Sequence, residues 1–142
     1  MCHVLYHAHG MLAGWIGAHA DSFPPIVVHI TDGESQDGDP RPYAEAVRAL
    51  ATSDGNVLLF NCHLSTTAAD QIMFVSREDQ IPDALGRELF LMSSELPPSM
   101  YQTAVAEGFE IKPGARGMAF NADLAVLIKF LDMGTRAAVR LR

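Results

Sequence analysis

The chain has only two cysteines, Cys2 and Cys62, among its 142 residues. Two cysteines are too few for the disulfide framework that stabilises small secreted domains, so a reducing compartment is expected. The apolar N-terminal stretch has no Lys or Arg, and four histidines interrupt it, which argues against a secretory signal peptide. No apolar run reaches the roughly 18 residues that a membrane span needs. We therefore expect a cytoplasmic protein with no membrane partner.

Basic residues are also scarce. Ten Lys and Arg residues stand against 17 Asp and Glu residues, which gives a formal net charge of -7. Nucleic-acid binders need Lys and Arg to displace phosphate counterions, so a nucleic-acid partner is not expected. With 49% hydrophobic and 19% charged residues, the composition is that of a globular chain, and the length fits one domain.

Short apolar runs rich in β-branched residues alternate with helical patterns. Alternation of this kind predicts right-handed crossovers and a mainly parallel sheet. The expected fold is α/β with three layers, a sheet of about three strands flanked by helices. Residues 1–22 are expected to form an N-terminal helix with Val4, Leu5 and Trp15 on one face, and residues 23–142 the remaining domain. The three expected strands lie within residues 25–30, 56–64 and 117–123.

The histidines near the N-terminus raise the possibility of a zinc site. His3 and His7 are four residues apart and share one face of a helix, with Cys2 and His9 nearby. No second cluster has the usual zinc-finger spacing, and scattered helix-surface histidines are the favoured interpretation. His29 lies in the middle of an expected strand, where a hydrogen-bonded core histidine is the common case.

Cys62 and His63 do not make a nucleophile and its base, because neighbouring residues on a strand point to opposite faces. Cys62 is expected to be a small buried apolar side chain. A serine hydrolase finds no support either, since the chain has no Gly-x-Ser-x-Gly motif.

An acidic loop follows the first expected strand. The strand ends in Thr31-Asp32-Gly33, and three more acids follow before residue 40. In open α/β sheets, ligands bind beyond the carboxyl ends of the strands, which is where Asp32 lies. The spacing does not fit an EF-hand, and Asp37 and Asp39 are expected to be solvated loop charges.

Four segments carry a resemblance to a known family. "PPIVVHITDGESQDGDP", "DGNVLLFNCHLS", "LFLMSSELP" and "ARGMAFNADLAVLIKFLDMGTR" resemble the C-terminal two-thirds of a bacterial von Willebrand factor type A (VWA) domain, over roughly residues 23–136. The resemblance implies a doubly wound sheet and a metal-ion-dependent adhesion site. Such a site binds Mg²⁺, or Mn²⁺ or Ca²⁺, and a carboxylate of a protein partner completes the coordination. By match to the family's Thr-Asp-Gly turn, the implied metal ligand is Asp32, with Thr31, Gly33 and Ser35 as possible contributors.

The sequence departs from the family in the part that precedes Asp32. The Asp-x-Ser-x-Ser motif that the family carries on its first strand does not occur in this chain. The segment before residue 23 reads as a single helix, so the family's first strands are expected to be missing and the metal site incomplete. Because the first strand of such a domain lies beside the one that ends at Asp32, the strand at residues 25–30 is expected to be an open edge. An open apolar edge favours self-association or pairing with a partner strand.

The sequence thus predicts a non-catalytic protein-binding module of the VWA type with an incomplete divalent-metal site. Two alternatives stay open. One is a small zinc-dependent or other metal-dependent enzyme that uses the N-terminal histidines. The other is an inactive, truncated gene product.

Overall fold

The computed structural model describes residues 1–64 and 70–140, with the backbone alone for residues 134–140. Its elements follow the predicted order of one helix, a strand, a helix, a strand, two helices, a strand and a last helix, with short additions. They are α1 (Cys2–Ala18), β1 (Ile26–Thr31), α2 (Arg41–Ala49), β2 (Ala51–Thr52), β3 (Gly55–Asn56), β4 (Leu58–Leu64), β5 (Ile72–Met73), the 3₁₀ turn η1 (Glu78–Gln80), α3 (Ala84–Met92), α4 (Pro98–Ala106), β6 (Met118–Ala122) and α5 (Leu124–Arg140).

The main sheet has four strands in the order β1-β4-β6-β5, where about three were expected. β1, β4 and β6 are the predicted strands and run parallel. The additional strand, β5, pairs antiparallel with β6 through two residues, which is too short a run to show a strand period in the sequence. β2 and β3 form a separate two-stranded hairpin. Within the described ranges β1 pairs with β4 alone, so the prediction that the strand before Asp32 lies at an edge is confirmed.

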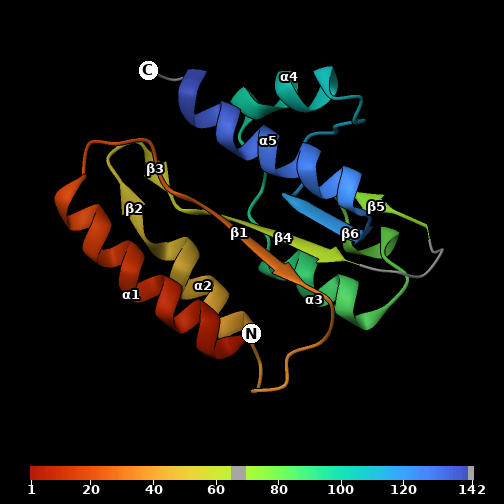
Figure 1. Ribbon diagram of the computed structural model, residues 1–142, viewed down its shortest axis with the longest axis horizontal. Helices are drawn as coiled ribbons and strands as arrows, with labels where there is room; N and C mark the ends of the chain where they lie inside the picture. Colours follow the sequence, from red (N-terminus) through yellow and green to blue (C-terminus); the bar gives the residue numbers. More distant parts are fainter. Residues whose placement is uncertain (65–69, 141–142) are drawn as a thin grey trace.

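Helices cover both faces of the sheet and make three layers. α2 and α3 contact β4 from one face, while α5 contacts β4 and β6 from the other and carries α4 on its outer side. Figure 1 shows this arrangement, with the sheet between α4 and α5 above and α2 and α3 below. The predicted caps of two helices are confirmed, since Asp83 accepts from the Gly86 N–H and Asp123 from the Val126 N–H.

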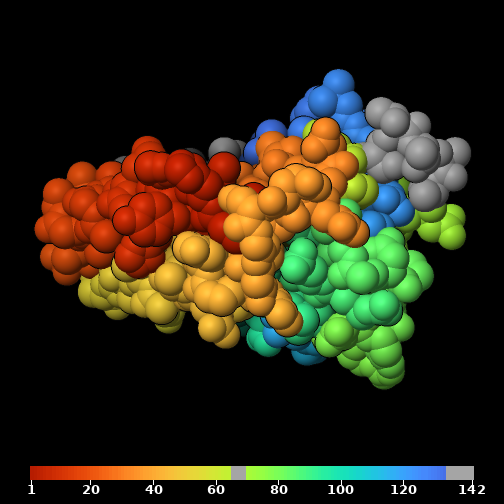
Figure 2. Space-filling view, turned by 90° about the horizontal axis from the view of Figure 1, so that it is seen from below, coloured from red at the N-terminus to blue at the C-terminus, as the bar shows by residue number. Residues whose placement is uncertain are grey.

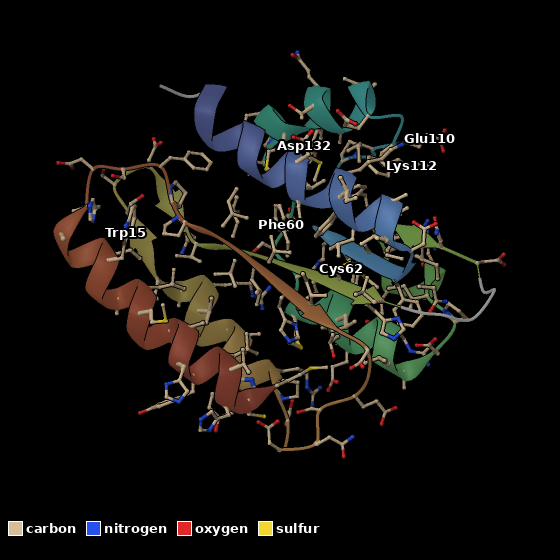
Figure 3. All side chains as sticks on the ribbon, viewed as in Figure 1. Trp15, Phe60, Cys62, Glu110, Lys112 and Asp132 are labelled. Carbon is tan, nitrogen blue, oxygen red and sulfur yellow. The ribbon has the colours of Figure 1, made fainter. Side chains whose placement is uncertain are left out.

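β4 passes through the centre of the protein, and all but the last of its residues are buried. Phe60 and Cys62 face the α5 side and pack in a cluster with Phe130, whereas Leu59 faces α2 and α3. The prediction that Cys62 is a buried apolar residue is confirmed, because none of its surface is exposed. Figure 3 labels Phe60 and Cys62 at the sheet and Trp15 far from them, on α1.

α1 lies outside the three layers and packs mainly along α2. Only Cys2 and Leu5 of its 17 residues are buried. The expected inward face is therefore wrong in part, because Val4 and Trp15 are 61% and 40% exposed. Figure 2 shows α1 in red, extending from the body of the molecule at the side opposite α3. No helix in the described part of the chain has both the length and the apolar character to cross a membrane.

Candidate functional site at the carboxyl edge of the sheet

The Thr-Asp-Gly turn closes the end of β1. Thr31 is in register with His63, so β1 and β4 end together at this edge. The Thr31 hydroxyl donates to the Gly33 carbonyl at 2.8 Å and accepts from the Gly33 N–H at 3.2 Å. These two hydrogen bonds close the turn and leave Asp32 at its tip. Asp32 is exposed, and its carboxylate has no hydrogen bond or ion pair to any residue that the structure describes.

Ser35 is directed away from Asp32. Its hydroxyl donates to Asp37 Oδ1 at 2.9 Å, and its Oγ lies 3.7 Å from the Cys2 sulfur. Of the four residues predicted for the metal site, Thr31, Asp32 and Gly33 share one turn, whereas Ser35 faces the start of α1. The turn therefore offers one free carboxylate.

Asp37 lies on the surface, as expected, but its carboxylate is engaged by the N-terminus of α1. Its carboxylate accepts from the Cys2 N–H at 3.0 Å, from the His3 N–H at 2.8 Å and from the Met1 ammonium at 2.7 Å. These donors form the N-terminus of α1, which otherwise has no side-chain cap. The donated hydrogen bonds, from His3 first, hold the pKa of Asp37 well below its ordinary value. The acidic loop thus fixes α1 to the edge of the sheet.

Asp39 is also engaged. The Arg41 guanidinium donates to its two oxygens at 2.9 and 2.7 Å, and these bonds lower the pKa of Asp39 to about 2. Both groups remain on the surface, as expected. Asp37 and Asp39 are therefore each occupied by a partner within the protein, which sets Asp32 apart from them.

A hollow of about 280 Å³ lies between the acidic loop and the start of α3. Glu34 and Glu88 contribute its carboxylates. The pKa of Glu88 is raised, first by burial and then by the negative charges of Asp39 and Glu34. Figure 2 shows the loop in orange between α1 and the green α3 on the face seen from below. The edge of the sheet beside Asp32 is therefore electronegative.

A buried polar network ties β1 to β4 and α3. The Asn61 side-chain amide donates to Ser93 Oγ at 2.9 Å, so its oxygen faces His29 Nδ1, which lies at 2.9 Å and is the donor. The prediction of a hydrogen-bonded core histidine at His29 is confirmed. Burial lowers the pKa of His29 and keeps it neutral, although the bond to Asn61 acts in the opposite direction.

The structure separates Cys62 from His63. Burial raises the pKa of the Cys62 thiol to about 11, which favours the protonated thiol near neutral pH. His63 is on the opposite face, where its ring stacks on Phe120 with the centroids 4.6 Å apart. Its Nδ1 lies 3.4 Å from the Asn121 N–H, which is the donor.

No group of three or more His, Cys, Asp or Glu side chains in residues 1–64 and 70–140 is arranged to hold a metal ion. An ion bound at Asp32 would therefore complete its coordination with water and with oxygens from another molecule. The single carboxylate fits a weak site for a hard cation such as Mg²⁺, which commonly takes one or two carboxylates and keeps several waters.

Two functional features were missed by reasoning from the sequence. Asp37 accepts a hydrogen bond from Cys2, which is 35 positions away in the sequence, and no local pattern predicts such a contact. Asn61 had a visible signal, because it interrupts the apolar strand "LLFNCHL", and a buried polar group needs a partner.

Comparison with known proteins gave no match: no family model, no curated protein and no solved structure is significantly similar to the chain.

Proposed function

We propose that the chain is a non-catalytic, VWA-type module that binds a protein partner along β1 and shares a divalent cation with it at Asp32. One observation carries the proposal: among the described residues, β1 is an edge strand that ends at an exposed carboxylate without a partner. The two free cysteines and the absence of a disulfide between them fit a cytoplasmic protein.

The edge of β1 supplies the first part of the interaction. Its sequence, Ile-Val-Val-His-Ile-Thr, has no formal charge and no proline, the features that natural edge strands commonly use to prevent pairing. Ile30 is 42% exposed on this strand. An added strand would gain main-chain hydrogen bonds along β1 and would cover this apolar surface. A strand of a partner, or β1 of a second copy, has the chemistry to bind there.

Asp32 supplies the second part. A strand added parallel to β1 would end beside Asp32, since the carboxyl ends of parallel strands meet at one edge of a sheet. A carboxylate on the partner would then share a Mg²⁺ ion with Asp32, and water would fill the remaining octahedral positions. Without the cation, two carboxylates at this acidic edge would repel one another. Binding of an acidic partner therefore requires the cation.

The resemblance to VWA domains supports the same assignment. The Thr31-Asp32-Gly33 turn follows an apolar strand of a parallel sheet, which is the position implied for the family's metal ligand. The turn offers one carboxylate, and Ser35 is bonded to Asp37, which is the reason for proposing that the partner contributes the other ligands.

Thermal unfolding with and without Mn²⁺ tests the metal site. For a dissociation constant on the order of 10⁻³ M, a tenfold excess of Mn²⁺ over that constant stabilises the native state by about 1.4 kcal/mol. We expect this upward shift for the wild type and for Asp39→Asn, whose carboxylate is already paired with Arg41. Asp32→Asn, which keeps the shape of the side chain, is expected to lose it. An equal shift in the wild type and in Asp32→Asn would refute the site.

A further inference from the structure

A second candidate site lies on α1, away from Asp32. His3 and His7 are one helical turn apart, and their Nε2 atoms are 2.8 Å from each other. The ring centroids are 4.5 Å apart, and both side chains are exposed. The two imidazole nitrogens therefore lie within hydrogen-bond distance of one another on an exposed part of α1.

This geometry is close to that of a chelating histidine pair. Zinc binds imidazole nitrogen at about 2.0–2.1 Å in tetrahedral geometry, which places two ligand nitrogens about 3.3 Å apart. A small rotation of either ring opens the 2.8 Å separation to this value. Because one stable helix carries both rings, little conformational freedom is lost when an ion binds. Imidazole suits Zn²⁺, Ni²⁺ and Cu²⁺ better than it suits Mg²⁺.

Neighbouring groups on the chain do not complete the coordination. The Cys2 sulfur is buried and lies beside Ser35 Oγ, and Asp37 accepts the hydrogen bonds of the helix N-terminus. Two positions of a tetrahedral ion therefore remain open on the solvent side of the pair.

The surface around the pair favours another copy of the same helix. α1 has no Asp, Glu, Lys or Arg over its 17 residues, although the whole chain has a net charge of -7. Met11 is 77% exposed on the His7 side of the helix, and a Cβ added at Gly10 or Gly14 would meet no neighbouring atom within 4 Å. Two such helices can approach closely without bringing like charges together. A two-fold axis through the ion would then supply the second histidine pair.

We propose that His3 and His7 form a transition-metal site, and that a second copy of the chain completes it as a four-histidine zinc centre between two α1 helices. The site is incomplete in one chain, and the ion links dimerisation to zinc concentration. This proposal does not depend on Asp32 or on β1.

Light scattering after size exclusion, combined with zinc analysis, tests it on the untagged full chain. With micromolar Zn²⁺ we expect a mass of two 15.4 kDa chains and one zinc per two chains, and with a chelator a return to the lower mass. His3→Ala and His7→Ala are expected to lose both the zinc and the zinc-dependent dimer. His9→Ala, a helix histidine outside the pair, is the matched control and is expected to keep both.

Three results would overturn the proposal. They are zinc bound one per chain on a monomer, a zinc-dependent dimer that persists in His3→Ala, and no zinc retained by the wild type. Asp32→Asn separates this site from the proposed function, since it is expected to keep the zinc-dependent dimer while losing the response to Mn²⁺. Circular dichroism of each variant, compared with the wild type, establishes that α1 remains folded.

Discussion

Gly117 sits where the chain approaches a core ring most closely. A Cβ atom at this position would overlap the Phe60 ring, which is fully buried against Phe130. The ring has no space into which to move, because close-packed cores have few voids. The residue before β6 must therefore be glycine for steric reasons.

Gly117→Ala is accordingly expected to lower the free energy of unfolding by about 1–3 kcal/mol, the usual cost of overpacking a core. Gly10→Ala is the matched control, since its Cβ would meet open space on a helix and is expected to stabilise by about 0.5–1 kcal/mol. Urea denaturation of both variants measures the two values. Equal and small effects would contradict the packing around Phe60.

His29 makes stability depend on pH. Because burial lowers its pKa in the folded state, the unfolded chain takes up the proton first as the pH falls below about 6.5. Stability is therefore expected to fall from about pH 6.5 down to the lowered folded pKa. His29→Gln keeps a donor for Asn61 but does not titrate, so its stability is expected to change less between pH 7.5 and 5.5. Denaturation curves at both pH values measure the difference. The same change in stability with pH in the wild type and in His29→Gln would refute the role of His29.

At the scale of elements, the start of α1 depends on a loop residue far away in the sequence. Asp37 accepts the N–H groups of Cys2 and His3, so the cap forms only when the acidic loop is folded against the helix. Asp37→Ala is expected to speed hydrogen exchange at the His3 amide several-fold, whereas Asp37→Ser, which can still cap, is expected to change it little. Unchanged exchange in Asp37→Ala would show that the contact contributes nothing to the helix.

β1 is the element on which the proposed binding rests. An apolar strand with one open edge is expected to associate at high concentration, so the scattering mass of the zinc-free wild type is expected to rise with concentration. Ile30→Lys places a charge on the exposed part of this strand and is expected to hold the protein as a monomer without loss of stability. A wild type that stays monomeric at high concentration would count against pairing along β1.

The elements that the sequence predicts best are those whose pattern is local. β1, β4 and β6 were found because each is a short, mostly apolar run, and Asp83 and Asp123 because caps act within three residues. β5 was not predicted because a strand of two residues is too short to show the alternating pattern of a β-strand. The inward face of α1 was predicted wrongly because helical spacing shows which residues share a face, whereas burial depends on what packs against it. Only the first turns of α1 reach the core.

At the scale of the whole molecule, the proposed function joins one carboxylate to one strand edge. The position of Asp32 could be predicted, because strand ends are visible in the sequence and ligands bind at that edge. The lack of a partner for its carboxylate among the described residues could not be predicted, since the nearby cations, the Met1 ammonium and Arg41, are paired with Asp37 and Asp39. The net charge of -7 attracts cations to the protein in general, and the exposed carboxylate of Asp32 offers them a specific position.

The most direct test of the central claim is the effect of Mn²⁺ on the amide NMR spectrum, because this paramagnetic ion broadens the signals nearest to it. We expect broadening centred on Asp32 and Gly33, weaker effects at His63, which is paired with Thr31 in the sheet, and loss of the pattern in Asp32→Asn. Broadening centred on Glu34 and Glu88 instead, or none at the end of β1, would contradict the claim that Asp32 is the metal ligand.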